Sequence, residues 1–147
     1  MKQGTAAKSH KYRRKIRRDP LDDLFSEYVR KRAMVRVGGC EKCKTLKFDT
    51  TREDGSTKPA YMQLEAAHYH GRGPHATRWD TDNSAGLCMG CHSYLDANPA
   101  EKTAWFKEQL GDEAFELLEL RRHIPGKDMD KSAIRIYLKL QLEEIKL

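Results

Sequence analysis

The sequence predicts a small α+β domain that is held together by one zinc ion and flanked by several helices. Three observations lead to this prediction. The chain has 147 residues, which is enough for one domain of about 100 to 150 residues. Its helical and strand-like stretches show no βαβ alternation of the kind that builds a parallel sheet. Four cysteines form two Cys-x2-Cys pairs, Cys40 with Cys43 and Cys88 with Cys91.

The composition argues against a membrane-spanning or secreted protein. Of the residues, 38% are hydrophobic and 34% are charged, so the expected core is thin for a globular chain. No continuous apolar stretch approaches the roughly 20 residues of a membrane span. Residues 1–18 are polar and basic and lack the apolar segment of a secretory signal. We therefore expect a cytoplasmic protein.

The net charge of +6 is concentrated at the N-terminus. Residues 1–19 carry eight lysines and arginines against Asp19 alone, a net charge of +7, whereas residues 20–147 sum to −1. A block of like charges stays extended and can replace counterions along phosphates. The sequence thus predicts a basic flexible arm (1–19) that contacts DNA and one folded domain (20–147), with a merely solubilising tail as the alternative. The candidate DNA contacts in the arm are Arg13, Arg14, Lys15, Arg17 and Arg18.

The cysteine spacing is the strongest local signal. Without a secretory signal the chain is expected in a reducing compartment, where paired cysteines are more often metal ligands than disulfides. Two Cys-x2-Cys pairs separated by 44 residues can place four thiolates at the corners of a tetrahedron, as structural zinc prefers. Redox-active or incidental thiols are the alternative.

The folded domain is expected to begin with a helix over residues 21–35. Pro20 suits the first helical turn, and Asp22 and Asp23 complement its positive end. Hydrophobic residues then recur at helical spacing, at Leu21, Leu24, Phe25, Tyr28 and Val29.

Residues 45–68 predict a β-hairpin or two short strands joined around the turn signal Asp54-Gly55. The strands are expected at residues 47–48 and 61–64, and the second leads into Ala66, Ala67 and His68. A loop rich in glycine, arginine and histidine follows over residues 70–83.

Helices are expected in the remainder of the chain. One grows out of the second cysteine pair over residues 88–95, another runs from Pro99 to Gly111, and Asp112 is expected to cap a third. Residues 131–147 fit both a strand alternation and a helical face, but their length and composition favour a helix.

The order His68, Asn83, His92 indicates hydrolytic chemistry. A zinc ion would clamp a strand pair against a helix, so that the two histidines face each other across a small cleft in a ββα unit. Phosphodiester hydrolysis needs a neutral imidazole to take a proton from water and a divalent cation to stabilise the departing oxygen.

This order of motifs resembles the HNH, or ββα-metal, endonucleases, and more closely the phage recombination endonuclease family called NinG or Rap. The resemblance extends over about residues 20–122. It is carried by Leu-Phe-Ser-Glu-Tyr-Val-Arg at 24–30, the two cysteine pairs, His68 followed by Arg72, and Ala-Thr-Arg-Trp-Asp-Thr-Asp-Asn at 76–83. The fold that it implies is a zinc-stapled ββα-metal (HNH) core.

The resemblance also implies catalytic roles. His68 is the expected general base, His92 is a ligand of the catalytic cation, and Asn83 braces the loop by hydrogen bonds to the backbone. The phosphate contacts would be Arg72 and Arg78, although loop arginines are often simply solvated.

One cation ligand is missing from the expected pattern. Many HNH enzymes carry an acid or a histidine immediately before the base, where this chain has Ala67. Asp96 lies one helical turn after His92 on the same face and is the expected substitute. Glu65 and His70 are weaker candidates.

The implied function is that of a metal-dependent DNA endonuclease with structural Zn2+ and catalytic Mg2+ or Mn2+. The family implies branched recombination intermediates such as Holliday junctions as substrates, products with 5′-phosphate and 3′-hydroxyl ends, and the cytoplasm of a bacterial host for a phage or prophage product. A homodimer would suit symmetric cutting. The alternatives are a sequence-specific or nonspecific HNH nuclease of duplex DNA and a noncatalytic zinc-knuckle DNA-binding protein.

Overall fold

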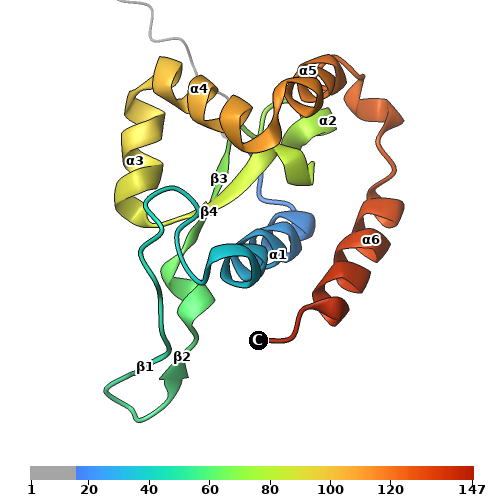
Figure 1. Cartoon of the computed structure of the whole chain (residues 1–147). Coiled ribbons are helices and arrows are strands. Elements are labelled where there is room, and N and C mark those ends of the chain that lie inside the picture. Colours follow the sequence, from blue (N-terminus) through green and yellow to red (C-terminus); the bar gives the residue numbers. More distant parts are fainter. Residues whose placement is uncertain (1–15) are drawn as a thin grey trace, which may run out of the picture.

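A computed structural model describes residues 16–147 and shows a mixed α+β fold (Figure 1), which confirms the predicted class. The arm residues Arg13, Arg14 and Lys15 lie outside the described residues. The regular elements are α1 (Pro20–Val37), β1 (Thr50–Thr51), β2 (Thr57–Lys58), β3 (Glu65–His68), α2 (His75–Arg78), β4 (Ser84–Leu87), α3 (Met89–Ala97), α4 (Pro99–Leu110), α5 (Asp112–Arg121) and α6 (Lys131–Glu144). Short 3₁₀ turns cover Ala60–Gln63, Thr81–Asn83 and Gly126–Asp128.

β3 and β4 form an antiparallel sheet at the centre of the fold (Figure 1), paired from Glu65 with Leu87 to His68 with Ser84. Helix α1 packs so closely on this sheet that a Cβ atom at Gly86 would lie 2.5 Å from the Cβ of Ala33. Only glycine fits that approach. Because β4 leads directly into α3, the chain contains a ββα unit.

Helix α1 begins where the sequence signals predict. The Asp19 carboxylate accepts a hydrogen bond from the Leu21 amide, and the Asp22 carboxylate accepts one from the Asp19 amide, both at 2.9 Å. This reciprocal cap satisfies amides that the helix leaves unpaired. Phe25 and Val29 are buried against the sheet and α6. The predicted helix is confirmed, although it runs two residues further, to Val37.

A second group of hydrophobic residues surrounds the ββα unit. Ala67 and Leu87 from the sheet belong to one buried cluster with Leu95 of α3, Phe106 of α4 and Phe115 of α5. The helices predicted after the second cysteine pair are thus present, and α3 to α5 wrap around this cluster (Figure 1).

The ambiguous C-terminal stretch is a helix, α6, which packs along α1 (Figure 1). Asp130 caps it by accepting a hydrogen bond from the Ala133 amide at 3.0 Å. Leu138 is fully buried in the cluster with Phe25 and Val29. By contrast Ile136 and Leu140, which a strand would place on the same face as Leu138, are 61% and 53% exposed.

The strand predictions were partly wrong. Residues 61–64 do not form a strand: a 3₁₀ turn follows Pro59 at Ala60–Gln63, and the Ala60 amide donates to the Asp49 carboxylate at 2.8 Å. A small hairpin, β1 with β2, does form around Asp54-Gly55, but between residues 50 and 58. β4 was not expected, because Ser-Ala-Gly-Leu has no strand-favouring β-branched residue and is held extended by pairing with β3.

Two boundaries also differ from expectation. Asp112 is the first helical residue of α5 and not its cap, since Gly111 with a φ of 82° precedes the helix. The folded part begins before residue 20, because the Arg17 carbonyl accepts a hydrogen bond from Arg78 at 2.7 Å and Asp19 pairs with Lys131 at 2.8 Å.

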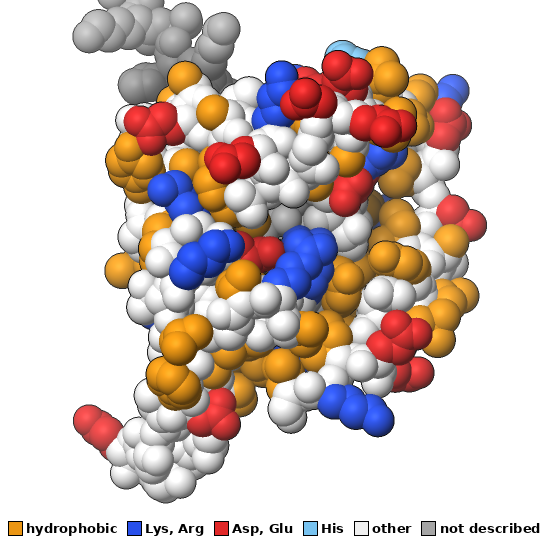
Figure 2. Space-filling model, in the orientation of Figure 1, with side chains coloured by type: hydrophobic (Ala, Val, Ile, Leu, Met, Phe, Trp, Pro, Cys, Tyr) orange, Lys and Arg blue, Asp and Glu red, His pale blue; other side chains and the backbone are white. Residues whose placement is uncertain are grey.

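The surface carries charges of both signs. Figure 2 shows basic and acidic side chains interspersed on one face, with hydrophobic side chains gathered on the side of α6. Within residues 16–147, no helix combines the length and the apolar character needed to cross a bilayer.

Candidate functional site

The four cysteines lie together between the end of α1 and the start of α3. All four sulfur atoms lie within 4.8 Å of one another, and the Sγ atoms of Cys43 and Cys88 are 3.9 Å apart. All four are free thiols. This cluster could hold a metal ion, as the spacing of the two pairs predicts.

Backbone contacts tie the first cysteine pair to the sheet. The chain turns so tightly after α1 that a Cβ atom at Gly39 would lie 2.0 Å from the Thr45 carbonyl oxygen. Glu41, between Cys40 and Cys43, is buried: its amide donates to the Gly86 carbonyl at 3.0 Å, and its carboxylate accepts from the Gly86 amide at 2.6 Å. The first pair is therefore fixed to β4, the strand that delivers the second pair.

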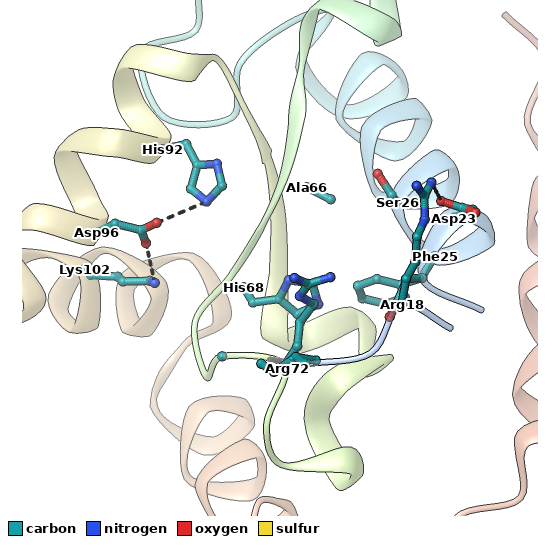
Figure 3. A pocket seen from close by; sticks show the side chains of 13 residues that line it. Arg18, Asp23, Phe25, Ser26, Ala66, His68, Arg72, His92, Asp96 and Lys102 are labelled. Atoms are coloured by element: carbon teal, nitrogen blue, oxygen red, sulfur yellow. Dashed lines mark hydrogen bonds and ion pairs between the residues drawn. The ribbon is translucent and has the colours of Figure 1, made fainter. Parts of the chain in front are cut away.

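A cavity of about 680 Å³ runs beside β3 and is lined by His68, His92 and Asp96, but not by Asn83. Figure 3 shows His92, Asp96 and Lys102 on one side of β3, with His68 and Arg72 near the end of the strand. The other wall is formed by α1, including Phe25. The structure thus brings His68, His92 and Asp96 to one cavity, although they come from two different elements.

His68 is held by a hydrogen bond to the loop backbone. Its Nε2 atom lies 2.8 Å from the Arg78 carbonyl oxygen, and since a carbonyl can only accept, Nε2 carries the proton. The Nδ1 atom then has its lone pair free. The ring also packs against Phe25, with the ring centroids 5.4 Å apart.

The surroundings of His68 keep it neutral. Burial lowers its pKa below the ordinary 6.5; the hydrogen bond to Arg78 opposes this shift, and the positive charge of Arg72 adds to it. The charges of Asp22, which raises the pKa, and of Lys102, which lowers it, act more weakly. A neutral imidazole at pH 7 is the form that can accept a proton.

His92 sits between two carboxylates. Its Nδ1 atom is 3.0 Å from Oε1 of Glu65 on β3, and its Nε2 atom is 3.3 Å from Oδ2 of Asp96 on the same helix. Both ring nitrogens of His92 therefore face a carboxylate oxygen, and Glu65 holds the orientation of the ring, as carboxylates do for metal-binding histidines. Nε2 of His92 and Oδ2 of Asp96 face each other in the cavity, so the two atoms could bind one cation together.

The expected position of the missing ligand is corrected by the structure. Ala67 is 1% exposed in the hydrophobic cluster and does not line the cavity. Glu65, two residues earlier on the same face of β3, approaches the ring of His92 from the side away from Asp96. Asp96 is therefore the better candidate ligand, and Glu65 acts through His92.

Asn83 braces the loop between β3 and β4. It is fully buried; its carbonyl oxygen accepts from the His70 amide at 2.7 Å, and its amide donates to the carbonyls of His70 and Thr77, both at 2.9 Å. One side chain thus closes the loop that follows His68. Asn83 does not line the cavity, so its hydrogen bonds position the loop.

His70 lies away from the candidate cation ligands. It is 8% exposed, and its Nε2 atom is 2.8 Å from Oε1 of Glu119 on α5. It does not line the cavity. We therefore remove His70 from the candidate ligands.

The two loop arginines have opposite environments. Arg78 is 4% exposed, and its guanidinium donates two hydrogen bonds to Asp22, at 2.9 and 2.6 Å, and one to the Arg17 carbonyl. This burial leaves no surface for a phosphate, so the expectation that Arg78 contacts DNA is corrected to a structural role. Arg72 is exposed at the cavity beside His68.

The described arm residues remain near the cavity. Arg17 and Arg18 are exposed, and Arg18 lines the cavity while it pairs with Asp23 at the start of α1. Arg18 and Arg72 therefore present positive charge at the same opening (Figure 3).

Sequence reasoning missed two residues that shape the site. Lys102 on α4 pairs with Asp96, with Nζ 2.7 Å from Oδ1, and no spacing rule links it to the histidines. Asp22 was assigned only to the start of α1, yet it also accepts a hydrogen bond from Trp79 at 3.0 Å and anchors Arg78. Strand alternation did indicate Glu65, though as a ligand and not as the partner of His92.

The chain was compared with known proteins in three ways. No family model, no curated protein and no solved structure matches it.

Proposed function

We propose that the chain is a zinc-containing, metal-dependent DNA endonuclease of the HNH type that cuts branched recombination intermediates. The observation that carries the proposal is the single cavity lined by a neutral histidine with a free ring nitrogen, His68, and by a histidine–aspartate pair suited to a divalent cation, His92 with Asp96.

Zinc is the metal that best suits the cysteine cluster. A tetrahedron with Zn–S bonds of about 2.3 Å has sulfur–sulfur edges of about 3.8 Å, close to the 3.9 Å between Cys43 and Cys88. Four thiolates without a further open position are typical of structural sites. The role proposed for this ion is to hold β4 and α3 against the turn after α1.

Asp96 and His92 fit a hard divalent cation. Two ligands at right angles on Mg2+, each at about 2.1 Å, are about 3.0 Å apart, and the Nε2 and Oδ2 atoms are 3.3 Å apart. A bound Mg2+ or Mn2+ would supply positive charge for the departing 3′ oxygen. In this proposal Glu65 accepts a hydrogen bond from Nδ1 of His92, which would leave the Nε2 lone pair for the cation.

The chain's own residues carry the proton transfer. Nδ1 of His68 takes a proton from a water molecule as the water oxygen attacks phosphorus, and Nε2 keeps its proton because it donates to the Arg78 carbonyl. The bond to the 3′ oxygen then breaks, and this oxygen takes a proton from a solvent water molecule, leaving 5′-phosphate and 3′-hydroxyl ends. Arg72 orients the phosphate from the exposed side of the loop.

Selectivity for branched DNA is supported by the kind of contacts available. Around the cavity, Arg18 and Arg72 offer phosphate contacts, which position a protein without reading sequence. Selectivity would then come from DNA geometry and deformability, which an open branch point supplies.

A noncatalytic DNA-binding protein is the second candidate. The ion pair between Lys102 and Asp96 favours it, because a lysine ammonium already neutralises the carboxylate proposed to hold the cation.

The test is cleavage by a His68→Ala variant. We expect the rate on a four-way junction in Mg2+ or Mn2+ to fall by about 100-fold or more, the usual contribution of a general base, with zinc content and DNA binding retained. His123→Ala, an exposed histidine outside the cavity, is the matched control. Cleavage by His68→Ala at the parental rate would reject the nuclease mechanism.

A competition between a junction and a linear duplex at fixed salt tests the substrate. We expect cutting near the branch, with little dependence on the sequence of the arms. Equal cleavage of both DNAs, or cutting at one base sequence wherever it is placed, would favour a nuclease of ordinary duplex DNA.

A further inference from the structure

Lys102 occupies an unexpected position in the cavity. It projects from α4, its side chain is 17% exposed, and Nζ lies 2.7 Å from Oδ1 of Asp96. The other oxygen of the same carboxylate faces Nε2 of His92 at 3.3 Å. Asp96 therefore binds Lys102 through Oδ1 and faces the candidate cation site at His92 with Oδ2 (Figure 3).

The backbone of Lys102 is fixed near His68. Tyr69, which follows His68, places its hydroxyl 3.2 Å from that of Thr103, and its ring lies 5.4 Å from the ring of Phe106. These contacts attach α4 to the end of β3. The ammonium, at the end of a flexible four-carbon stem, can change partners while the helix stays in place.

The charges lining the cavity show which partner suits Lys102. Asp22 is already held by Arg78 and Asp23 by Arg18, so Asp96 is the acid in the cavity that pairs with Lys102 through one oxygen and faces His92 with the other. A divalent cation at His92 and Asp96 would repel the Lys102 ammonium. An anion in the cavity would attract it, together with Arg72.

We propose, on the basis of the nuclease function above, that Lys102 forms a phosphate-binding subsite with Arg72. In the free protein Asp96 holds Lys102, which competes with the divalent cation. When the cation binds Asp96, Lys102 is released toward a non-bridging oxygen of the DNA phosphodiester. Binding of the cation and binding of the phosphate would thereby favour each other.

Removing the Lys102 ammonium should strengthen Mn2+ binding and slow DNA cleavage. Lys102→Met keeps most of the apolar stem, so zinc-loaded, full-length protein without DNA should bind Mn2+ about fivefold more tightly, the size of a modest coupling between sites. In single-turnover cleavage of a junction at saturating Mn2+, the same variant should be about tenfold slower or worse. Lys102→Arg should recover most of the cleavage rate, because it restores the positive charge.

Lys107→Met is the matched control, since it removes the same charge from an exposed position of α4 outside the cavity. Unchanged or weaker Mn2+ binding by Lys102→Met, or cleavage at the parental rate, would overturn the proposal. The Mn2+ measurement needs no activity. If the parent protein cuts no DNA, the nuclease function fails, and tighter Mn2+ binding by Lys102→Met would still support the competition at Asp96.

Discussion

Helix α3 joins two polar clusters of opposite character. Its N-cap Cys88 and its first-turn residue Cys91 join Cys40, which is buried, and Cys43, which is exposed, in a compact group of thiols. The next turn contributes His92 and Asp96, whose side chains are 27% and 50% exposed and whose partners come from β3 and α4. We call the cysteines the closed cluster, because their four sulfur atoms lie within 4.8 Å of one another, and His92 with Asp96 the open cluster, because their polar atoms line a cavity.

The comparison teaches how stability and chemistry are separated in a small chain. The closed cluster, together with the buried Asp22–Arg78 pair and Asn83, fixes the backbone around the cavity. The open cluster can then leave Asp96 shared between Lys102 and His92, because these residues do not have to hold the fold together. Changes in the closed region should therefore affect stability, and changes in the open region should affect metal binding and rate.

The largest effect is expected from the cysteine cluster. Cys88→Ser should abolish zinc binding and unfold or precipitate the protein, because apparent zinc-binding energies of about 10 kcal/mol or more are coupled to folding. Circular dichroism together with elemental analysis of zinc measures this. Soluble, folded parent protein without zinc would contradict the assignment of a structural metal.

The next largest effect is expected at the buried ion pair. Asp22→Asn leaves the buried Arg78 guanidinium without a counterion, and breaking such a pair costs about 3 to 5 kcal/mol of unfolding free energy. Denaturant unfolding measures it. Asp23→Asn, which affects only an exposed pair, should leave the unfolding free energy nearly unchanged, because solvent screens exposed ion pairs. Equal effects of the two variants would remove the distinction between the closed and open regions.

The same pair should make stability depend on acid pH. Burial acts to raise the pKa of Asp22, but hydrogen bonds from Arg78, the Asp19 amide and Trp79 outweigh it and lower the pKa from 3.8 to about 2. The carboxylate thus contributes stability above pH 4 that is lost as the pH falls toward 2. In Asp22→Asn this part of the pH dependence should disappear.

A smaller effect is expected from the residue that orients His92. Glu65→Ala removes the acceptor at Nδ1, and loss of such a partner lowers metal affinity or activity by about 10- to 100-fold. Cleavage measured against Mn2+ concentration should shift to higher Mn2+, with the rate partly recovered at saturation. Glu53→Ala, an exposed acid beside the β1–β2 turn, is the control and should leave the curve unchanged.

The smallest effect near neutrality is expected from pH itself. His68 must be neutral to act as a base, and burial lowers its pKa below 6.5, so the rate should rise from acid pH and level off by about pH 7. Below the pKa the rate should fall by about tenfold per pH unit. If the cleavage rate reached half its maximum only above pH 6.5, His68 would not be held in an apolar environment.

The sequence predicted most of the elements whose signals are local. The periodic apolar residues of α1, and the prolines Pro20 and Pro99 in the first turns of α1 and α4, are signals that act within a few residues of chain. The two Cys-x2-Cys pairs likewise indicate one metal site. The short strand β4 escaped prediction because Ser-Ala-Gly-Leu has little intrinsic strand preference. Its conformation comes from pairing with β3 and from the close approach of α1 at Gly86.

Only the tertiary structure decided which polar residues share an environment. Arg72 and Arg78 look alike in the sequence, but their environments differ. Arg72 is exposed at the cavity, whereas Arg78 is buried against Asp22, which lies 56 positions before it in the chain. Glu65 and Lys102 reach His92 and Asp96 from separate elements. The physical reason is that ion pairs and desolvation act through space, whereas residue spacing reports only contacts within one turn, one strand or one metal-binding loop.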